Sequence, residues 1–170
     1  MNDSQIKVHE ALKTAIQSEM DGYHFYRMAA GNTDDEKARD VFGRLAQEER
    51  HHAAFLKKQY KAIMDTGSPD ADLKLEKPAD FSGPGPIFSD AIRKRIGTAH
   101  MEMSALSIGL QLELDSESFY RKEAQASENE VISSFFGELA DWEAGHYRAL
   151  KQQMDELKED YWNTGAFSPF

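Results

Sequence analysis

The sequence predicts an all-α fold, a bundle of four long helices built from two helical hairpins that repeat each other. Two observations predict it. First, residues of the first half recur in the second half at a constant offset of 94 positions, the separation of Glu19 from Glu113. Second, four long segments without proline keep their apolar residues at helical spacing, and strand signals are absent.

The first predicted helix covers residues 4–30. Ser4 is its candidate N-cap, because serine side chains accept hydrogen bonds from the exposed N–H groups at a helix start. Val8, Leu12 and Ile16 then follow four residues apart, which places them on one face of the helix. This pattern predicts a helix with one buried side.

The second predicted helix covers residues 34–64. Thr33 followed by Glu36 has the spacing of a capping box, in which two side chains satisfy N–H groups at the helix start. Val41 and Leu45 begin the apolar stripe of this helix. At ~1.5 Å rise per residue each helix would be roughly 40–50 Å long, and the short turn between them makes an antiparallel hairpin.

Residues 65–97 form the one clear interruption of the helical pattern. Glycine and proline mark turns at residues 65–69 and 81–86, and residues 89–96 are a candidate short helix that ends at Gly97. Adjacent antiparallel helices need a much shorter connection. This one could run the length of the bundle and deliver the third helix parallel to the second, as in ferritin-like folds with one crossover.

The second half repeats the helix signals of the first. Thr98 is the candidate N-cap of a helix over residues 98–125, and Ser127 followed by Glu130 is a capping box for a helix over residues 128–160. We therefore predict a single ferritin-like domain. It spans residues 1–170 and comprises a hairpin at 4–64, a crossover at 65–97, a hairpin at 98–160 and an aromatic tail at 161–170.

Acidic and histidine side chains recur in register within this repeat. Each half has one glutamate in its first helix and, thirty residues later, a Glu-x-x-His in its second. The six residues are Glu19, Glu49, His52, Glu113, Glu143 and His146. Glu19 lies fourteen residues before Thr33 and Glu49 sixteen after it, so both would sit roughly 21–24 Å from the turn, at one height of the bundle. Two facing hairpins would enclose four carboxylates and two imidazoles.

Such a set of donors predicts a centre for two metal ions. Six ligands are too many for one tetrahedral zinc ion, and four carboxylates carry the charge that neutralises two divalent cations. Glutamate oxygen and histidine nitrogen suit iron and manganese, and they also bind zinc. The types of ligand therefore do not separate iron from manganese.

A second Glu-x-x-His overlaps the first one in the second helix. Glu48 and His51 have this spacing. At the matching positions the second half has Trp142 and Gly145, so the motif is not repeated. The repeat therefore selects the set that begins at Glu49.

The stretch that carries the first glutamate resembles a known family. Residues 15–26, AIQSEMDGYHFY, together with the Glu-x-x-His at Glu49, are similar to rubrerythrins of the ferritin-like di-iron carboxylate superfamily. The likeness covers residues 4–158. It implies two irons bridged by Glu49 and Glu143, with Glu19 and Glu113 as terminal carboxylates and His52 and His146 as nitrogen ligands. Tyr26 and Tyr120 match tyrosines that steady the opposing carboxylate, and they also fit as aromatic core residues.

By this resemblance the protein is an oxidoreductase that reduces hydrogen peroxide, or dioxygen, at two irons. Rubrerythrins carry a rubredoxin-like domain with a four-cysteine iron, whereas this sequence has no cysteine. Electrons are therefore expected from an external donor protein such as a rubredoxin. Rubrerythrins also have an extra glutamate about one turn beyond the third-helix ligand, where this chain has Ser116. We expect a six-ligand centre, with Glu117 as the remaining candidate for a seventh ligand.

Charge and hydropathy narrow the range of partners. A net charge of −10 argues against nucleic acid and anionic membranes. No apolar run approaches the ~18 residues of a membrane span, and the first residues lack the features of a signal peptide, so we expect a cytoplasmic protein. We also expect a homodimer. Three other functions stay open: a ferroxidase or iron-sequestering protein, a dimanganese catalase-like enzyme, and a metal-stabilised bundle without catalysis.

Overall fold

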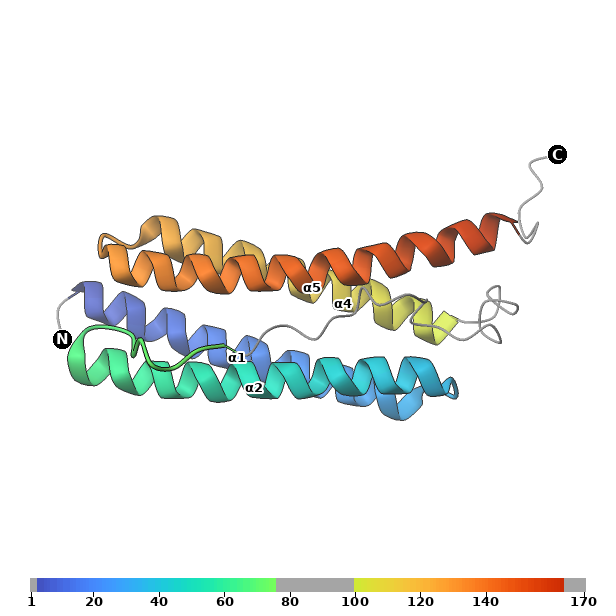
Figure 1. Cartoon of the computed structure of the whole chain (residues 1–170), viewed down its shortest axis with the longest axis horizontal. Helices are drawn as coiled ribbons and strands as arrows, with labels where there is room; N and C mark the ends of the chain where they lie inside the picture. Colours follow the sequence, from blue (N-terminus) through green and yellow to red (C-terminus); the bar gives the residue numbers. More distant parts are fainter. Residues whose placement is uncertain (1–2, 76–99, 164–170) are drawn as a thin grey trace.

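Four long α-helices make up the fold in the computed structural model of the chain, which describes residues 3–75 and 100–163 (Figure 1). The helices are α1 (Asp3–Asn32), α2 (Glu36–Thr66), α4 (His100–Ala126) and α5 (Glu130–Asn163). Within these two ranges there is no β-strand. The all-α prediction is confirmed.

The helices pair as two antiparallel hairpins. α1 packs along α2 and α4 packs along α5, and the hairpins also meet through α1 and α4. Helix α2 ends at one end of the bundle and α4 begins at the other, so α2 and α4 run in the same direction (Figure 1). This is the predicted ferritin-like bundle with one long crossover between its hairpins.

The start of the crossover turns back along α2. Gly67 adopts the left-handed conformation (φ 81°) and its N–H donates to Ile63 O at 2.8 Å, which ends the helix. The buried Gln59 side chain then holds the chain at Asp70 by two hydrogen bonds. Its Nε2 donates to the backbone O of Asp70 at 3.0 Å, and its Oε1 accepts from the backbone N–H of Asp70 at 2.8 Å. The second predicted turn and the candidate short helix at 89–96 lie outside the described residues.

The N-caps of α2 and α5 lie two residues later than predicted. Asp35, not Thr33, caps α2, since its carboxylate accepts from the Ala38 N–H at 2.8 Å. Asn129, not Ser127, has the same role in α5, and its amide oxygen accepts from the backbone N–H groups of the second and third residues after it at 2.9 and 3.2 Å. Both capping-box predictions are wrong by the same shift, so the repeat itself holds.

A buried polar contact explains why Thr33 does not cap α2. Its hydroxyl donates to the carboxylate of Glu102 at 2.9 Å, and both residues are buried between the hairpins.

Two further predicted helix boundaries differ in the structure. Ser4 lies inside α1, which begins at Asp3, and α5 continues to Asn163, so the predicted tail begins later than residue 161. Thr98 lies outside the described residues.

Two apolar clusters fill the bundle, one on either side of its middle. One cluster is centred on Tyr26, Phe42 and Leu106, and the other on Tyr120, Phe136 and Leu12. Most members of one cluster are the repeat counterparts of members of the other. Burying each of these large side chains contributes roughly 1.5–3 kcal/mol, so the two clusters provide most of the stability and fix the height of what lies between them.

We predict opposite effects for two glycine-to-alanine substitutions. A Cβ at Gly109 would lie 3.0 Å from the Tyr26 hydroxyl and 3.1 Å from its ring, whereas a Cβ at Gly137 would meet nothing within 4 Å. Gly109→Ala should lower the free energy of unfolding by ~1–3 kcal/mol through overpacking. Gly137→Ala should raise it by ~0.5–1 kcal/mol through helix propensity.

Chemical denaturation of the metal-free variants measures both effects. If Gly109→Ala were as stable as Gly137→Ala, the close packing of Tyr26 against α4 would be wrong.

Candidate metal centre

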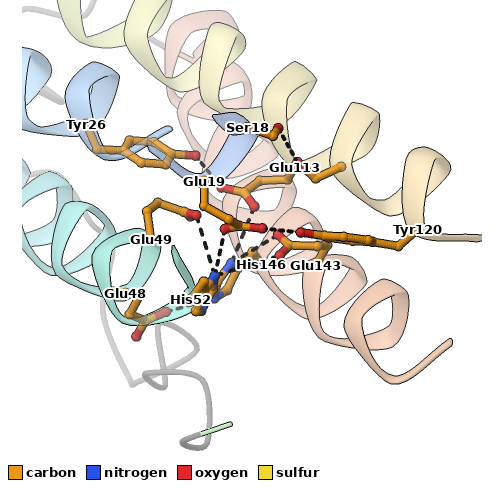
Figure 2. A network of polar contacts seen from close by, with 11 residues as sticks. Ser18, Glu19, Tyr26, Glu48, Glu49, His52, Glu113, Tyr120, Glu143 and His146 are labelled. Atoms are coloured by element: carbon orange, nitrogen blue, oxygen red, sulfur yellow. Dashed lines mark hydrogen bonds and ion pairs between the residues drawn. The ribbon is translucent and has the colours of Figure 1, made fainter. Parts of the chain in front are cut away.

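A layer of buried polar side chains lies between the two apolar clusters, and all four helices contribute to it (Figure 2). The structure brings the six predicted residues together there, each no more than 4% exposed. They are Glu19, Glu49, His52, Glu113, Glu143 and His146. Their meeting at one height follows from the matched spacings on either side of each hairpin turn.

Each histidine points its Nδ1 atom at carboxylates of its own hairpin. His52 Nδ1 lies 3.0 Å from Glu19 Oε2 and 3.5 Å from Glu49 Oε2. His146 Nδ1 lies 3.3 Å from Glu113 Oε2 and 3.7 Å from Glu143 Oε2. The two imidazole rings are nearly parallel, with centroids 5.6 Å apart. Each hairpin thus supplies half of one centre.

Glu143 joins the two halves. Its Oε1 atom lies 3.8 Å from His52 Nδ1, while its Oε2 atom faces His146. Glu49 belongs to two groups of three donors: one with Glu19 and His52, the other with Glu113 and His146. Within each group the donor atoms lie within 4.8 Å of one another. Two adjacent positions that share a carboxylate are the arrangement expected for a pair of metal ions.

The two buried tyrosines tie the hairpins together across this layer (Figure 2). The Tyr26 hydroxyl on α1 donates to Glu113 Oε1 on α4, and the Tyr120 hydroxyl on α4 donates to Glu19 Oε1 on α1. In each glutamate the other oxygen, Oε2, faces a histidine. The tyrosines are therefore buried core residues that also hydrogen-bond to the carboxylate of the opposite hairpin. The structure thus contains both of the arrangements that the sequence allowed for them.

The four carboxyl groups form two pairs, one with lowered and one with raised pKa values. Burial alone would raise the pKa of Glu19, but its hydrogen bonds with His52 and Tyr120 lower it to about 2. The pKa of Glu113 is lowered in the same way by His146 and Tyr26, against the effect of burial.

Glu49 and Glu143 titrate in the opposite direction. Burial, and then repulsion by neighbouring carboxylates, raises the pKa of each well above its usual value. In the metal-free protein these two glutamates therefore retain protons that a bound cation would displace.

The two histidines also differ. Burial lowers the pKa of His52 despite the nearby Glu19 carboxylate. Burial acts in the same direction on His146, but the carboxylates of Glu113, Glu143 and Glu48 outweigh it and raise the pKa of His146 well above its usual value. Glu48 is one of two neighbours that the sequence did not assign to the centre.

Those two neighbours, Glu48 and Trp142, contact the outer sides of the histidines. Glu48 Oε2 lies 2.7 Å from His146 Nε2, and the Trp142 ring centroid lies 3.6 Å from that of His52. The sequence contains one signal for them, because the repeat is broken at this pair of positions directly before the Glu-x-x-His motifs. His51 is exposed and contacts Gln47. The geometry therefore agrees with choosing the motif that begins at Glu49 over the overlapping one that ends at His51.

Neither candidate for a seventh ligand joins the cluster. The Ser116 hydroxyl lies 3.4 Å from that of Ser18, between α1 and α4. Glu117 instead forms an ion pair with Arg121, its carboxylate 2.8 Å from Nε. The buried layer therefore consists of the six predicted side chains without either of these two.

The donors fit a pair of divalent cations. Four carboxylates and two imidazoles are the ligands that iron and manganese bind, and two divalent ions would neutralise the clustered negative charge. Glu49 Oε1 is buried and has no hydrogen-bond partner among the described residues, which leaves it available to a cation.

The family comparison agrees with this chemistry. The rubrerythrin family model matches residues 10–154. The chain belongs to the rubrerythrin family. No curated protein and no solved structure matches it. Rubrerythrin membership accounts for the fold and for a buried carboxylate–histidine cluster able to hold metal. Separately, none of the helices in the described ranges is long and apolar enough to cross a bilayer.

We predict that the metal-free protein loses stability as the pH rises from 5 to 8. Glu49 and Glu143 have pKa values raised above the ordinary 4.5, so their stabilising protonated forms are lost as the pH rises toward those values. The raised pKa of His146 acts in the same direction, while the lowered pKa of His52 opposes it near pH 6.5.

Urea denaturation in the presence of chelator, at pH 5.5 and pH 8, measures this slope. Replacing both Glu49 and Glu143 by glutamine should flatten it, whereas Glu159→Gln, at an exposed position, should leave it unchanged. A metal-free parent that is more stable at pH 8 than at pH 5.5 would contradict the assignment of these protons.

Proposed function

We propose that this protein is a di-iron oxidoreductase that reduces hydrogen peroxide, or dioxygen, with electrons from a separate donor protein such as a rubredoxin. The observation that carries this proposal is the pair of donor groups that share Glu49 in a buried layer. Membership of the rubrerythrin family supports iron as the metal. The homodimer and the cytoplasmic location remain predictions.

Each side chain of the layer has a role in this proposal. Glu19 and His52 would hold one metal, Glu113 and His146 the other, and Glu49 and Glu143 would lie between them. Iron bound here supplies reversible one-electron chemistry and Lewis acidity. The layer itself excludes water, because its six donors are almost fully buried.

The tyrosines keep the terminal carboxylates in place while the charge of the centre changes. Burial and the neighbouring carboxylates raise the pKa of Tyr26 and of Tyr120 well above the ordinary value of 10, so both remain hydrogen-bond donors at neutral pH. A tyrosine that keeps its proton at neutral pH continues to orient the carboxylate oxygen it contacts, Glu113 Oε1 or Glu19 Oε1. The Oε2 atoms then remain directed at the metal positions.

In this proposal the electrons come from outside the 170 residues of this sequence. The 170 residues contain no cysteine, so no four-cysteine iron site lies among them. Turnover should therefore depend on an added reductant, and a stoichiometric oxidation without one should stop after a single event.

One observation favours a second candidate, a ferroxidase or iron-sequestering protein. Ser116 stands where rubrerythrins have an extra glutamate, and its hydroxyl contacts Ser18 and none of the six donors. A centre without that carboxylate has fewer ligands to follow a change in iron charge. The relative rates with peroxide and dioxygen separate the two candidates.

We predict two metal ions per chain. Iron added anaerobically to metal-free protein should bind in a ratio near two, as measured by elemental analysis after desalting. Glu113→Ala removes a buried donor and should reduce the ratio to about one, whereas Glu117→Ala, at the residue paired with Arg121, should keep it at two. A parent ratio near one that is unchanged by Glu113→Ala would contradict the paired site.

We predict that the diferrous protein is oxidised faster by peroxide than by air. Ser116→Glu should increase the preference for peroxide by restoring a carboxylate beside the centre, and Ser18→Ala serves as the control for loss of the serine contact. Stopped-flow absorbance with each oxidant gives the two rates. Faster oxidation of the parent by dioxygen would select the ferroxidase function instead.

A further inference from the structure

The two halves of the centre differ at the position directly before each Glu-x-x-His motif. Glu48 and Trp142 occupy equivalent positions of the repeat, one residue before Glu49 and Glu143. Both side chains cross between α2 and α5 to reach the histidine of the other hairpin. The centre is symmetric in its six donors and asymmetric in what supports them.

The supporting contacts differ in kind. Glu48 Oε2 lies 2.7 Å from His146 Nε2, on the side of the ring opposite to Nδ1. The Trp142 ring packs against the His52 ring, with centroids 3.6 Å apart and the rings at 70°, and His52 Nε2 is buried without a hydrogen-bond partner among the described residues. Trp142 also lies against His146, at 4.5 Å between centroids.

A carboxylate behind a metal-binding histidine changes the strength of that ligand. It accepts the Nε2–H hydrogen, which fixes the tautomer that presents the Nδ1 lone pair to the metal and makes the ring more basic. Losing such a partner typically costs 10–100-fold in metal affinity. An indole offers no equivalent acceptor, because its nitrogen only donates.

We propose that Glu48 and Trp142 make the two metal positions unequal, so that the position of Glu113 and His146 fills first and binds divalent metal more tightly than that of Glu19 and His52. This inference rests on the proposed dimetal site. Glu48 is a positioning residue for His146, and Trp142 covers His52 without strengthening it.

Trp142 also lines a groove between α2, α5 and the start of the crossover, together with Phe55, Phe135 and residues of the segment 69–75. The same indole packs more closely against His52 than against His146, with ring centroids 3.6 and 4.5 Å away. Metal at the His52 position is expected to exchange with solution while metal at the His146 position stays bound.

Titration of the metal-free protein with Co(II), followed by visible absorption and calorimetry, tests the inference without relying on activity. The parent should bind two ions in two steps. At one equivalent of Co(II), His52→Ala should keep the first-step spectrum and affinity, and His146→Ala should lose them. The opposite pattern, or equal losses in both variants, would overturn the order of filling.

The contribution of Glu48 is measured by substitution. Glu48→Ala should weaken the first step 10–100-fold and leave the second within about twofold, and Glu48→Gln should fall between parent and alanine. Gln47→Ala, one position earlier on the exposed side of α2, is the matched control and should change neither step. An unchanged first step in Glu48→Ala, or equal weakening of both steps, would overturn the role of Glu48.

The reciprocal variant is Trp142→Glu, which copies Glu48 into the second half. It should strengthen the second step and bring the two affinities together, whereas Trp142→Phe should keep them apart. If Trp142→Glu does not fold, the Glu48 series decides alone. A parent that binds no Co(II) would refute the proposed dimetal site, whereas two bound ions with no effect of Glu48 would refute only the inequality.

Discussion

Repulsion among four buried glutamates is the constraint on which the rest of this structure depends. Glu19, Glu49, Glu113 and Glu143 lie in one layer at the middle of the bundle, each no more than 4% exposed. Buried carboxylates so close together cannot all remain ionised without cations. The layer responds in two ways: hydrogen bonds hold one pair ionised, and protons neutralise the other pair. Cations bound in this layer would neutralise the same negative charge.

The apolar clusters and the tyrosines keep this layer from opening to solvent. Each cluster draws on both hairpins, so separating the hairpins would expose both cores at once. Tyr26 and Tyr120 then join the hairpins at the height of the charges, each donating to a carboxylate of the opposite one. The close approach of Tyr26 to Gly109 shows how little space this crossing leaves. The same side chains therefore serve packing and the orientation of the donors.

The repeat explains the symmetry of the donors, and its breaks show where the halves can differ in function. Gly22 packs against Glu49, where a Cβ would lie 3.3 Å from Glu49 Cγ, while its counterpart Ser116 carries a side chain that reaches Ser18. Glu48 and Trp142 form the other break and contact opposite histidines. In the proposed dimetal centre, the second of these breaks would make the two metal positions unequal.

The sequence by itself determined the four helices, the crossover and which six side chains meet in the buried layer. Helical spacing and hairpin geometry are local properties, so the distances of Glu19 and Glu49 from the first turn already place them at one height. The cap at Asp35 was missed because Thr33 makes a long-range contact with Glu102, which no local pattern reveals. The cap at Asn129 is shifted by the same two residues. Only the tertiary structure decided which carboxyls carry protons and which partner each histidine has. Those properties depend on which atoms of side chains from different helices come into contact, and spacing along the chain fixes the height of a residue in the bundle but not these contacts.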